Sequence, residues 1–256
     1  MLFAAGLGTR LKPLTDNIPK ALVGFNGQTL LEWNIKRLLK AGFEHIVVNV
    51  HHFAPLVIQY LEDNKGFGAN IVISDESSEL LDTGGGLKKA SSCFQKDQPI
   101  LIHNVDIISD IDLKGFYDYH CAQNVLATLA VRNRKSSRVL LFDEEDLLRG
   151  WRNNATGELK IPTSGNNELA INNNLKSEII DPTNLTPFAF SGIQVINYKL
   201  LSLITESDKF SMIDVYLRLS ANHSIKAFRH DSDYWTDVGK IEELMKAENE
   251  IMKRIK

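Results

Sequence analysis

The first hundred residues alternate short apolar runs with amphipathic stretches, and this alternation constrains the fold more than any other feature of the chain. Short apolar runs separated by helical patterns are typical of a mostly parallel sheet covered by helices. We therefore predict an α/β protein. The predicted strands of the first half are Leu2–Ala5, His45–Val50, Asn70–Ser74 and Ile100–His103.

A well-marked helix is predicted between the first two strands. Thr29 and Glu32 have the spacing of a capping box at its start, and Gly42 can end it. Its apolar positions recur at helical spacing on one face; they are Leu30, Leu31, Ile35, Leu38 and Leu39. Strand, helix and strand together predict a βαβ unit.

Beyond residue 122 the pattern becomes richer in strands, which predicts a β-rich elaboration. The segment Asn153–Asn174 is rich in Asn, Gly and Ser, and we predict a hairpin tip or a mobile loop there. No linker interrupts the 256 residues, so we predict one domain, 1–256, with halves 1–122 and 123–256. The expected elements of the second half are strands at Val125–Arg132, Arg138–Phe142, Leu147–Trp151 and Phe188–Ile196, and helices near Met212–Ser220 and from Lys240 onward.

Charge and composition argue against several classes of partner. The formal net charge is -3 and no Lys/Arg-rich block occurs, so we expect no nucleic-acid partner. We see no leader-like pattern and no apolar run that could cross a bilayer, so we expect a cytoplasmic protein without a membrane partner. Cys93 and Cys121 lack metal-ligand spacing, and we expect reduced, buried thiols.

The first candidate motif follows the first strand, where the chain runs directly into Gly6, Gly8, Thr9 and Arg10. Glycines let a backbone approach phosphates, and an arginine adds a forked donor for phosphate oxygens. Lys20 adds a point charge. A tight turn is the plain alternative. A dinucleotide fingerprint and a Walker-type loop both fail, because the required third glycine and the GxxxxGK[ST] pattern are absent.

A second motif is the glycine triplet at 84–86, where Thr83 can cap a helix whose first turn is glycine. Each glycine costs about 0.5–1 kcal/mol relative to alanine in a helix, so we expect something to approach this backbone closely. The alternative is a helix end packed against the sheet.

Two carboxylates complete the candidate chemistry. Asp106 follows a buried strand at its carboxyl end, where ligands bind in open α/β sheets, and a carboxylate there suits Mg²⁺. Asp237 follows an aromatic strand and precedes the closing helix. Each could instead cap a helix, and for Asp237 the residues alone favour the cap. Gly192, within an apolar strand, could mark a bulge.

The segment Ala4-Ala5-Gly6-Leu7-Gly8-Thr9-Arg10, with Pro19-Lys20, resembles the signature of the nucleoside-diphosphate-sugar pyrophosphorylase family, and the later motifs extend the resemblance over nearly the whole chain. The resemblance implies the Rossmann-like nucleotide-diphospho-sugar transferase fold. Chains of this family begin a few residues earlier, so we expect an N-terminally extended form to be more stable. The family's added β-helix has no room here, which disfavours a bifunctional acetyltransferase.

The resemblance also implies roles for particular residues. Arg10 and Lys20 would be catalytic, and Asp106 and Asp237 would bind Mg²⁺. Asn104 and Gly192 would contact the sugar. The residues implied for nucleotide binding are Ala5, Gly6, Gly8, Thr9, Glu79, Thr83, Gly84 and Gly85.

The implied reaction is attack of a sugar-1-phosphate oxygen on the α-phosphorus of an NTP, with pyrophosphate leaving. The motifs most resemble enzymes that use UTP with N-acetylmuramate 1-phosphate, followed by those that use GTP with mannose or heptose 1-phosphate. A noncatalytic regulatory subunit that senses nucleotide or sugar on the same fold is the alternative. Such a subunit would be free to lose its charged groups. This chain retains all four of them, which are Arg10, Lys20, Asp106 and Asp237.

Overall fold

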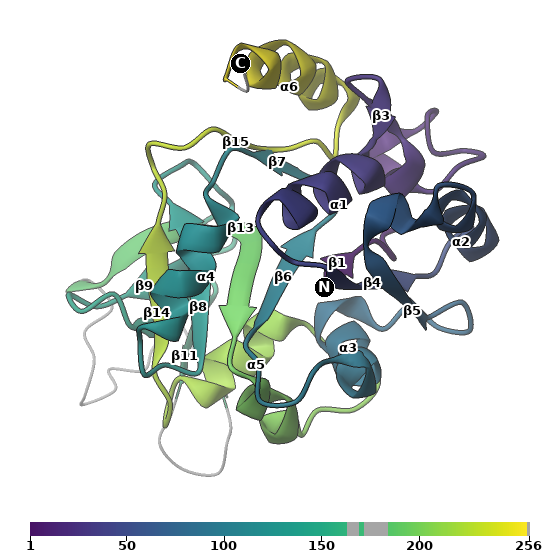
Figure 1. Cartoon of the computed structure of the whole chain (residues 1–256). Helices are drawn as coiled ribbons and strands as arrows, with labels where there is room; N and C mark the ends of the chain where they lie inside the picture. Colours follow the sequence, from purple (N-terminus) through teal and green to yellow (C-terminus); the bar gives the residue numbers. More distant parts are fainter. Residues whose placement is uncertain (163–168, 172–183, 255–256) are drawn as a thin grey trace.

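The computed structural model describes residues 1–162, 169–171 and 184–254 and confirms the α/β class (Figure 1). In that part of the chain the helices are α1 (Leu30–Lys40), α2 (Ala54–Asp63), α3 (Asp82–Lys89), α4 (Leu113–Cys121), α5 (Met212–Leu219) and α6 (Ile241–Arg254). The strands are β1 (Leu2–Phe3), β2 (Gly24–Phe25), β3 (Gln28–Thr29), β4 (His45–Val50), β5 (Asn70–Asp75), β6 (Ile100–Asn104), β7 (Ile107–Ser109), β8 (Ala127–Arg132), β9 (Arg138–Phe142), β10 (Leu148–Asn153), β11 (Leu159–Pro162), β12 (Leu169–Ile171), β13 (Thr186–Ile196), β14 (Ile225–Arg229) and β15 (Trp235–Asp237).

The large sheet runs in the order β12-β11-β10-β9-β13-β6-β1-β4-β5, and β8 pairs with both β13 and β14. The four strands of the first half, β5, β4, β1 and β6, are parallel, as the βαβ pattern predicted. Strand β13 is antiparallel to β6 and joins this parallel part to the β-rich second half. The carboxyl ends of the four parallel strands therefore lie at the same edge of the sheet. The strands of the second half extend the sheet beyond β6.

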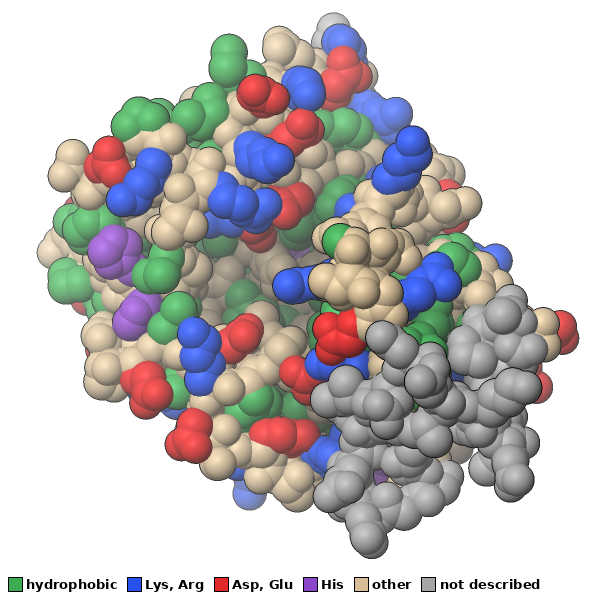
Figure 2. Space-filling view, turned by 180° about the vertical axis from the view of Figure 1, so that it is seen from behind, with side chains coloured by type: hydrophobic (Ala, Val, Ile, Leu, Met, Phe, Trp, Pro, Cys, Tyr) green, Lys and Arg blue, Asp and Glu red, His purple; other side chains and the backbone are tan. Residues whose placement is uncertain are grey.

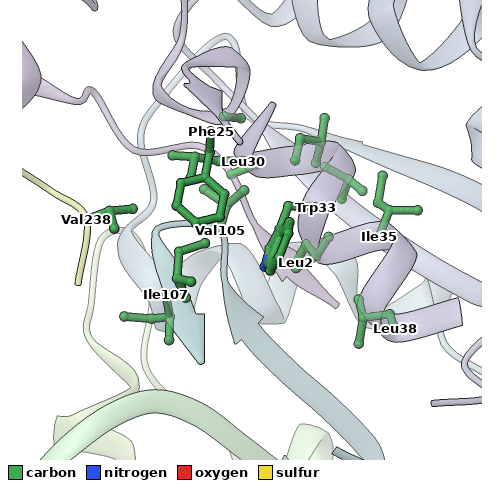
Figure 3. Close-up of a cluster of buried hydrophobic side chains, with 14 of the residues drawn as sticks. Leu2, Phe25, Leu30, Trp33, Ile35, Leu38, Val105, Ile107 and Val238 are labelled. Carbon is green, nitrogen blue, oxygen red and sulfur yellow. The ribbon is translucent and has the colours of Figure 1, made fainter. Parts of the chain in front are cut away.

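Two apolar cores cover the two faces of the sheet. Successive residues of β1 enter different cores, because side chains alternate along a strand. Leu2 belongs to the core that contains α1, α2, α4 and α6, whereas Phe3 belongs to the core that contains α3 and α5. Figure 3 shows Leu2 beside Trp33 of α1, in the cluster that also contains Val105, Ile107 and Val238.

The predicted helix between the first two strands is confirmed as α1. The Thr29 side chain accepts a hydrogen bond from the Glu32 N–H at 3.1 Å and so caps it. Strand β1 is shorter than predicted and ends at Phe3, because the Ala4 N–H leaves the sheet and donates to Asn49 Oδ1 at 2.7 Å. Strand pairing therefore ends two residues earlier than the apolar run suggests.

Two expectations were wrong, the cap of α3 and the burial of Cys121. Helix α3 begins at Asp82 without a side-chain cap, so Thr83 lies inside the helix. The hairpin tip predicted within Asn153–Asn174 is confirmed, because β10 and β11 pair antiparallel across the turn that joins them; strands β11 and β12 themselves were not anticipated, and positions 163–168 and 172–174 lie outside the described residues. Cys121 is exposed rather than buried. In addition, α2 and β14 were not anticipated.

No described helix has the length and apolar character needed to span a membrane.

Candidate functional site

A cavity of about 380 Å³ opens where the parallel strands end. It is lined by Phe3, Ala5, Gly6, Lys20, Asn49, Glu76, Leu80, Asp82, Thr83, Asn104, Val105, Asp106 and Lys209. Viewed from behind, the molecule is hollowed near the middle of this face, with basic and acidic side chains around the hollow (Figure 2). This location, at the carboxyl edge of an open α/β sheet, is where such folds bind ligands.

The glycine-rich loop folds back onto Lys20. Gly8 has φ 65°, and a Cβ there would lie 2.9 Å from Thr15 Cγ2 and 3.1 Å from Lys20 Cβ. Thr15 Oγ1 also donates to the Gly8 carbonyl at 2.8 Å. Gly8 is therefore required by its own backbone and neighbours. Gly6 differs, because a Cβ there would meet no atom within 4 Å, and its backbone faces open space in the cavity.

Two ion pairs bring together the four charged residues singled out from the sequence. Lys20 pairs with Asp106, and both side chains are largely buried. Arg10 Nη2 lies 3.4 Å from Asp237 Oδ2, and this pair is more exposed. Two unlike charges held in a partly buried site interact more strongly than on the surface.

Strands β7 and β15 hold the two pairs side by side. Asp237 lies opposite Ile107 in their antiparallel register, and the Val238 N–H donates to the Asp106 carbonyl at 2.9 Å. Val105 and Val238 are buried in the apolar core and so fix the backbone beside each carboxylate (Figure 3). Residues 227 positions apart in the sequence thus meet at one site.

The structure shows whether Asp106 and Asp237 cap helices, which was the alternative to metal binding. Asp112 is the residue that caps α4, accepting from the Gly115 N–H at 3.0 Å, so Asp106 is not needed for that purpose. Asp237 Oδ1 accepts from the Gly239 N–H at 2.7 Å, two residues before α6 begins. Asp237 therefore orders the turn into the closing helix while its other oxygen faces Arg10.

The carboxylates of Asp106 and Asp237 suit a magnesium ion. Mg²⁺ takes oxygen ligands and is commonly held by one or two carboxylates together with substrate phosphates. The turn before β7 and the end of its neighbour β15 supply two such carboxylates here, beside two cations that could pair with the phosphates. The described residues contain no group of three or more acidic, His or Cys side chains placed to hold a metal by themselves.

Asn49 and Glu76 are cavity residues that the sequence analysis missed. Asn49 Nδ2 donates to Glu76 Oε1 at 2.7 Å while its Oδ1 accepts from the Ala4 N–H, so Asn49 links the glycine-rich loop to Glu76. Glu76 is fully buried, and this burial raises its pKa. The sequence signal that could have identified Asn49 was a polar residue near the carboxyl end of a mostly apolar strand. Glu79, the candidate base contact, is exposed and does not line the cavity.

The glycine triplet is approached by the chain itself. A Cβ on Gly84 would lie 2.9 Å from the Phe210 carbonyl and closer still to the Phe210 ring. A Cβ on Gly85 would lie 2.7 Å from the Asp208 carbonyl. The close approach predicted from the triplet therefore exists, but a loop of the second half makes it. The same loop places Lys209 in the cavity, whereas Gly84 and Gly85 do not line it.

The two residues predicted for the sugar lie against one another. The register of β13 shifts between Phe190 and Gln194, and Gly192 in this irregularity has φ 73°. A Cβ on Gly192 would be 2.9 Å from Asn104 Nδ2, so the bulge allows the Asn104 amide to pack there. Asn104 lines the cavity, and Gly192 is buried behind it.

A glycine-rich loop beside paired Lys, Arg and Asp side chains, at the carboxyl edge of an α/β sheet, is characteristic of proteins that bind nucleotide phosphates. The chain belongs to the nucleotidyl transferase family, whose model matches residues 1–139.

Curated relatives match about half of the chain. It is 46% identical over 110 residues to N-acetylmuramate alpha-1-phosphate uridylyltransferase of Caulobacter vibrioides, a match covering 42% of this chain and 45% of the relative. It is 37% identical over 133 residues to mannose-1-phosphate guanyltransferase of Neurospora crassa, covering 51% and 36%. The matched region thus spans less than half the length of either relative.

Solved structures share the whole fold. UDP-glucose pyrophosphorylase complexed with UDP-glucose has a TM-score of 0.72 at 16% identity, covering 99% of this chain and 98% of that one. HddC from Yersinia pseudotuberculosis complexed with GMP-PN has a TM-score of 0.69 at 20% identity, covering 98% and 97%. At such low identity these likenesses establish the fold alone.

Proposed function

We propose that the protein transfers a nucleoside monophosphate from an NTP to a sugar-1-phosphate and releases pyrophosphate. The observation that carries this proposal is the pair of neighbouring ion pairs, Lys20–Asp106 and Arg10–Asp237, beside the glycine-rich loop. Attack by one phosphate on another gathers negative charge at one point, and fixed cations there lower the barrier. The reaction needs no nucleophilic side chain.

Each group has a separate part in the proposed reaction. The open backbone at Gly6 would bind the triphosphate, and Arg10 would donate to its oxygens as pyrophosphate leaves. Lys20, held beside Asp106, would contact phosphates of both substrates and keep them in line. Mg²⁺ on Asp106 and Asp237 would neutralise phosphate charge when bound. Thr83 would lie on the nucleotide side, and Asn104 on the sugar side.

The substrates proposed for this chain are those that its motifs imply, and the names of the relatives support the N-acetylmuramate and mannose pairs. They are UTP with N-acetylmuramate 1-phosphate, or GTP with mannose or heptose 1-phosphate. We assign the nucleotide to half 1–122 and the sugar to half 123–256 of a single domain. A noncatalytic sensor of the same ligands is the second candidate.

A pyrophosphate-release screen tests the proposal. Each NTP is combined with a panel of sugar-1-phosphates in the presence of Mg²⁺, and Asp106→Asn protein purified in parallel reports any contaminating activity. We expect release with at least one pair by the wild type and none above background by the variant. Nucleotide binding without release across the panel would favour the sensor instead.

A further inference from the structure

Arg134 is a cation of the sugar half that neither the motifs nor the proposed reaction uses. Its guanidinium carbon lies 4.4 Å from the centre of the Trp235 ring, so the group stacks on the indole. Its Nη2 donates to the Phe190 carbonyl at 3.2 Å. Stacking and one hydrogen bond fix the plane of the guanidinium and leave in-plane N–H groups for another partner.

The irregular part of β13 holds Arg134 and the sugar-side residues in one unit. The Phe190 carbonyl accepts from Arg134, and the Ser191 carbonyl accepts from Trp235 Nε1 at 2.8 Å. The next residue, Gly192, packs against the Asn104 amide that lines the cavity. These three consecutive residues of β13 therefore fix the positions of Arg134, the Trp235 ring on which it stacks, and Asn104 relative to one another.

The geometry also directs Arg134 toward the reaction centre. Trp235 and Asp237 are two residues apart on β15, so their side chains leave the same face of that strand. Arg134 stacks on Trp235 and therefore lies on the face that presents Asp237. Burial lowers the pKa of Arg134, and the nearby Asp237 charge opposes this lowering.

Arg134 has unused hydrogen-bonding capacity. Within the part of the chain that the structure describes, it forms no ion pair, and its Nε is buried without a hydrogen-bond partner. Its remaining bond, from Nη1 to the Lys135 carbonyl, is long at 3.5 Å. A half-buried arginine in this state is suited to a forked contact with an oxyanion.

We propose that Arg134 binds an oxyanion of the sugar-1-phosphate, either its phosphate or a carboxylate carried on the sugar. This inference rests on the proposed transferase function and adds a specificity-determining residue on its sugar side. N-acetylmuramate 1-phosphate and N-acetylglucosamine 1-phosphate separate the two sources, since both carry the phosphate and only the first carries a carboxylate.

The test compares Arg134→Met and Arg134→Lys with the wild type, using Arg138→Met as the matched control. Arg138 is an exposed arginine of the same segment, and its replacement removes the same charge. For each protein, KM and kcat are measured for both sugar phosphates and for the NTP, and melting temperatures are recorded. Arg134→Lys keeps the charge but loses the planar fork, so we expect an intermediate effect.

We expect Arg134→Met to lower kcat/KM by about 10- to 100-fold, through the KM of the sugar phosphate, with the KM of the NTP unchanged. A loss confined to the muramate substrate assigns the carboxylate, and an equal loss with both substrates assigns the phosphate. Values equal to those of Arg138→Met, or a change only in the KM of the NTP, would overturn the inference while leaving the transferase proposal intact. Failure of the wild type to release pyrophosphate with any pair would instead remove the transferase proposal.

Discussion

Replacing Gly84 with alanine distinguishes two explanations of the glycine triplet. The new Cβ would lie 2.9 Å from the Phe210 carbonyl and would overlap the Phe210 ring. Overpacking of this kind costs about 1–3 kcal/mol. Alanine returns about 1 kcal/mol through its better helix propensity. The clash involves backbone as well as a ring, so we expect a net loss of about 1–2 kcal/mol, or roughly 2–8 °C in melting temperature for a domain of this size.

Thermal unfolding of Gly84→Ala, Phe210→Ala and the double variant measures this effect. Removing the ring relieves part of the clash, so the two changes should be less destabilising together than their sum, by about 0.5 kcal/mol or more. Gly24→Ala is the control, because the nearest atom to its Cβ would be 4.0 Å away. A Gly84→Ala protein of unchanged or higher stability, with a raised KM for the NTP, would refute loop packing and assign the glycine to the nucleotide.

Two further predictions concern stability. Asn49→Ala leaves the buried Ala4 N–H without a partner and removes one of the hydrogen bonds of the Glu76 carboxyl, which keeps its bond from the Leu81 N–H, so we expect a loss of about 1–3 kcal/mol in urea unfolding; unchanged stability would contradict the link between loop and strand. Burial lowers the pKa of three histidines, to about 3 for His103 and about 4 for His120 and His230. Since the unfolded chain binds these protons first, stability should fall as pH drops below about 6.5, by up to ~1.4 kcal/mol per pH unit for each histidine, and a flat urea midpoint between pH 7 and 5 would be inconsistent with this.

The sequence predicted the elements whose signals are local. Thr29 and the apolar face of α1 lie within a dozen residues of one another, and β4 contains the apolar run Ile46, Val47 and Val48, so neighbouring residues sufficed. The four charged residues were also found, because each follows a glycine turn, a proline or an apolar strand. Their arrangement as two adjacent ion pairs was not predicted, since it depends on the pairing of β7 with β15.

Features that depend on distant contacts were missed or misassigned. The triplet at Gly84 signals close approach but not its partner, and Phe210 lies in the other half of the chain. Glu76 resembles any acidic residue after a strand until Asn49 is placed beside it. The partners of Arg134 likewise come from β13 and β15, which pattern alone does not bring together.

The rate of pyrophosphate release by Asp106→Asn tests the proposed centre most directly. Asparagine keeps the size of the side chain but removes the charge that faces Lys20 and suits a magnesium ion. Asp16→Asn is the control, because it removes a carboxylate from an exposed ion pair with Lys12. With melting curves showing that both variants are folded, we predict a fall of about 100-fold or more in kcat for Asp106→Asn and a near-normal rate for Asp16→Asn. A folded Asp106→Asn protein that releases pyrophosphate at close to the wild-type rate would contradict the proposed reaction centre.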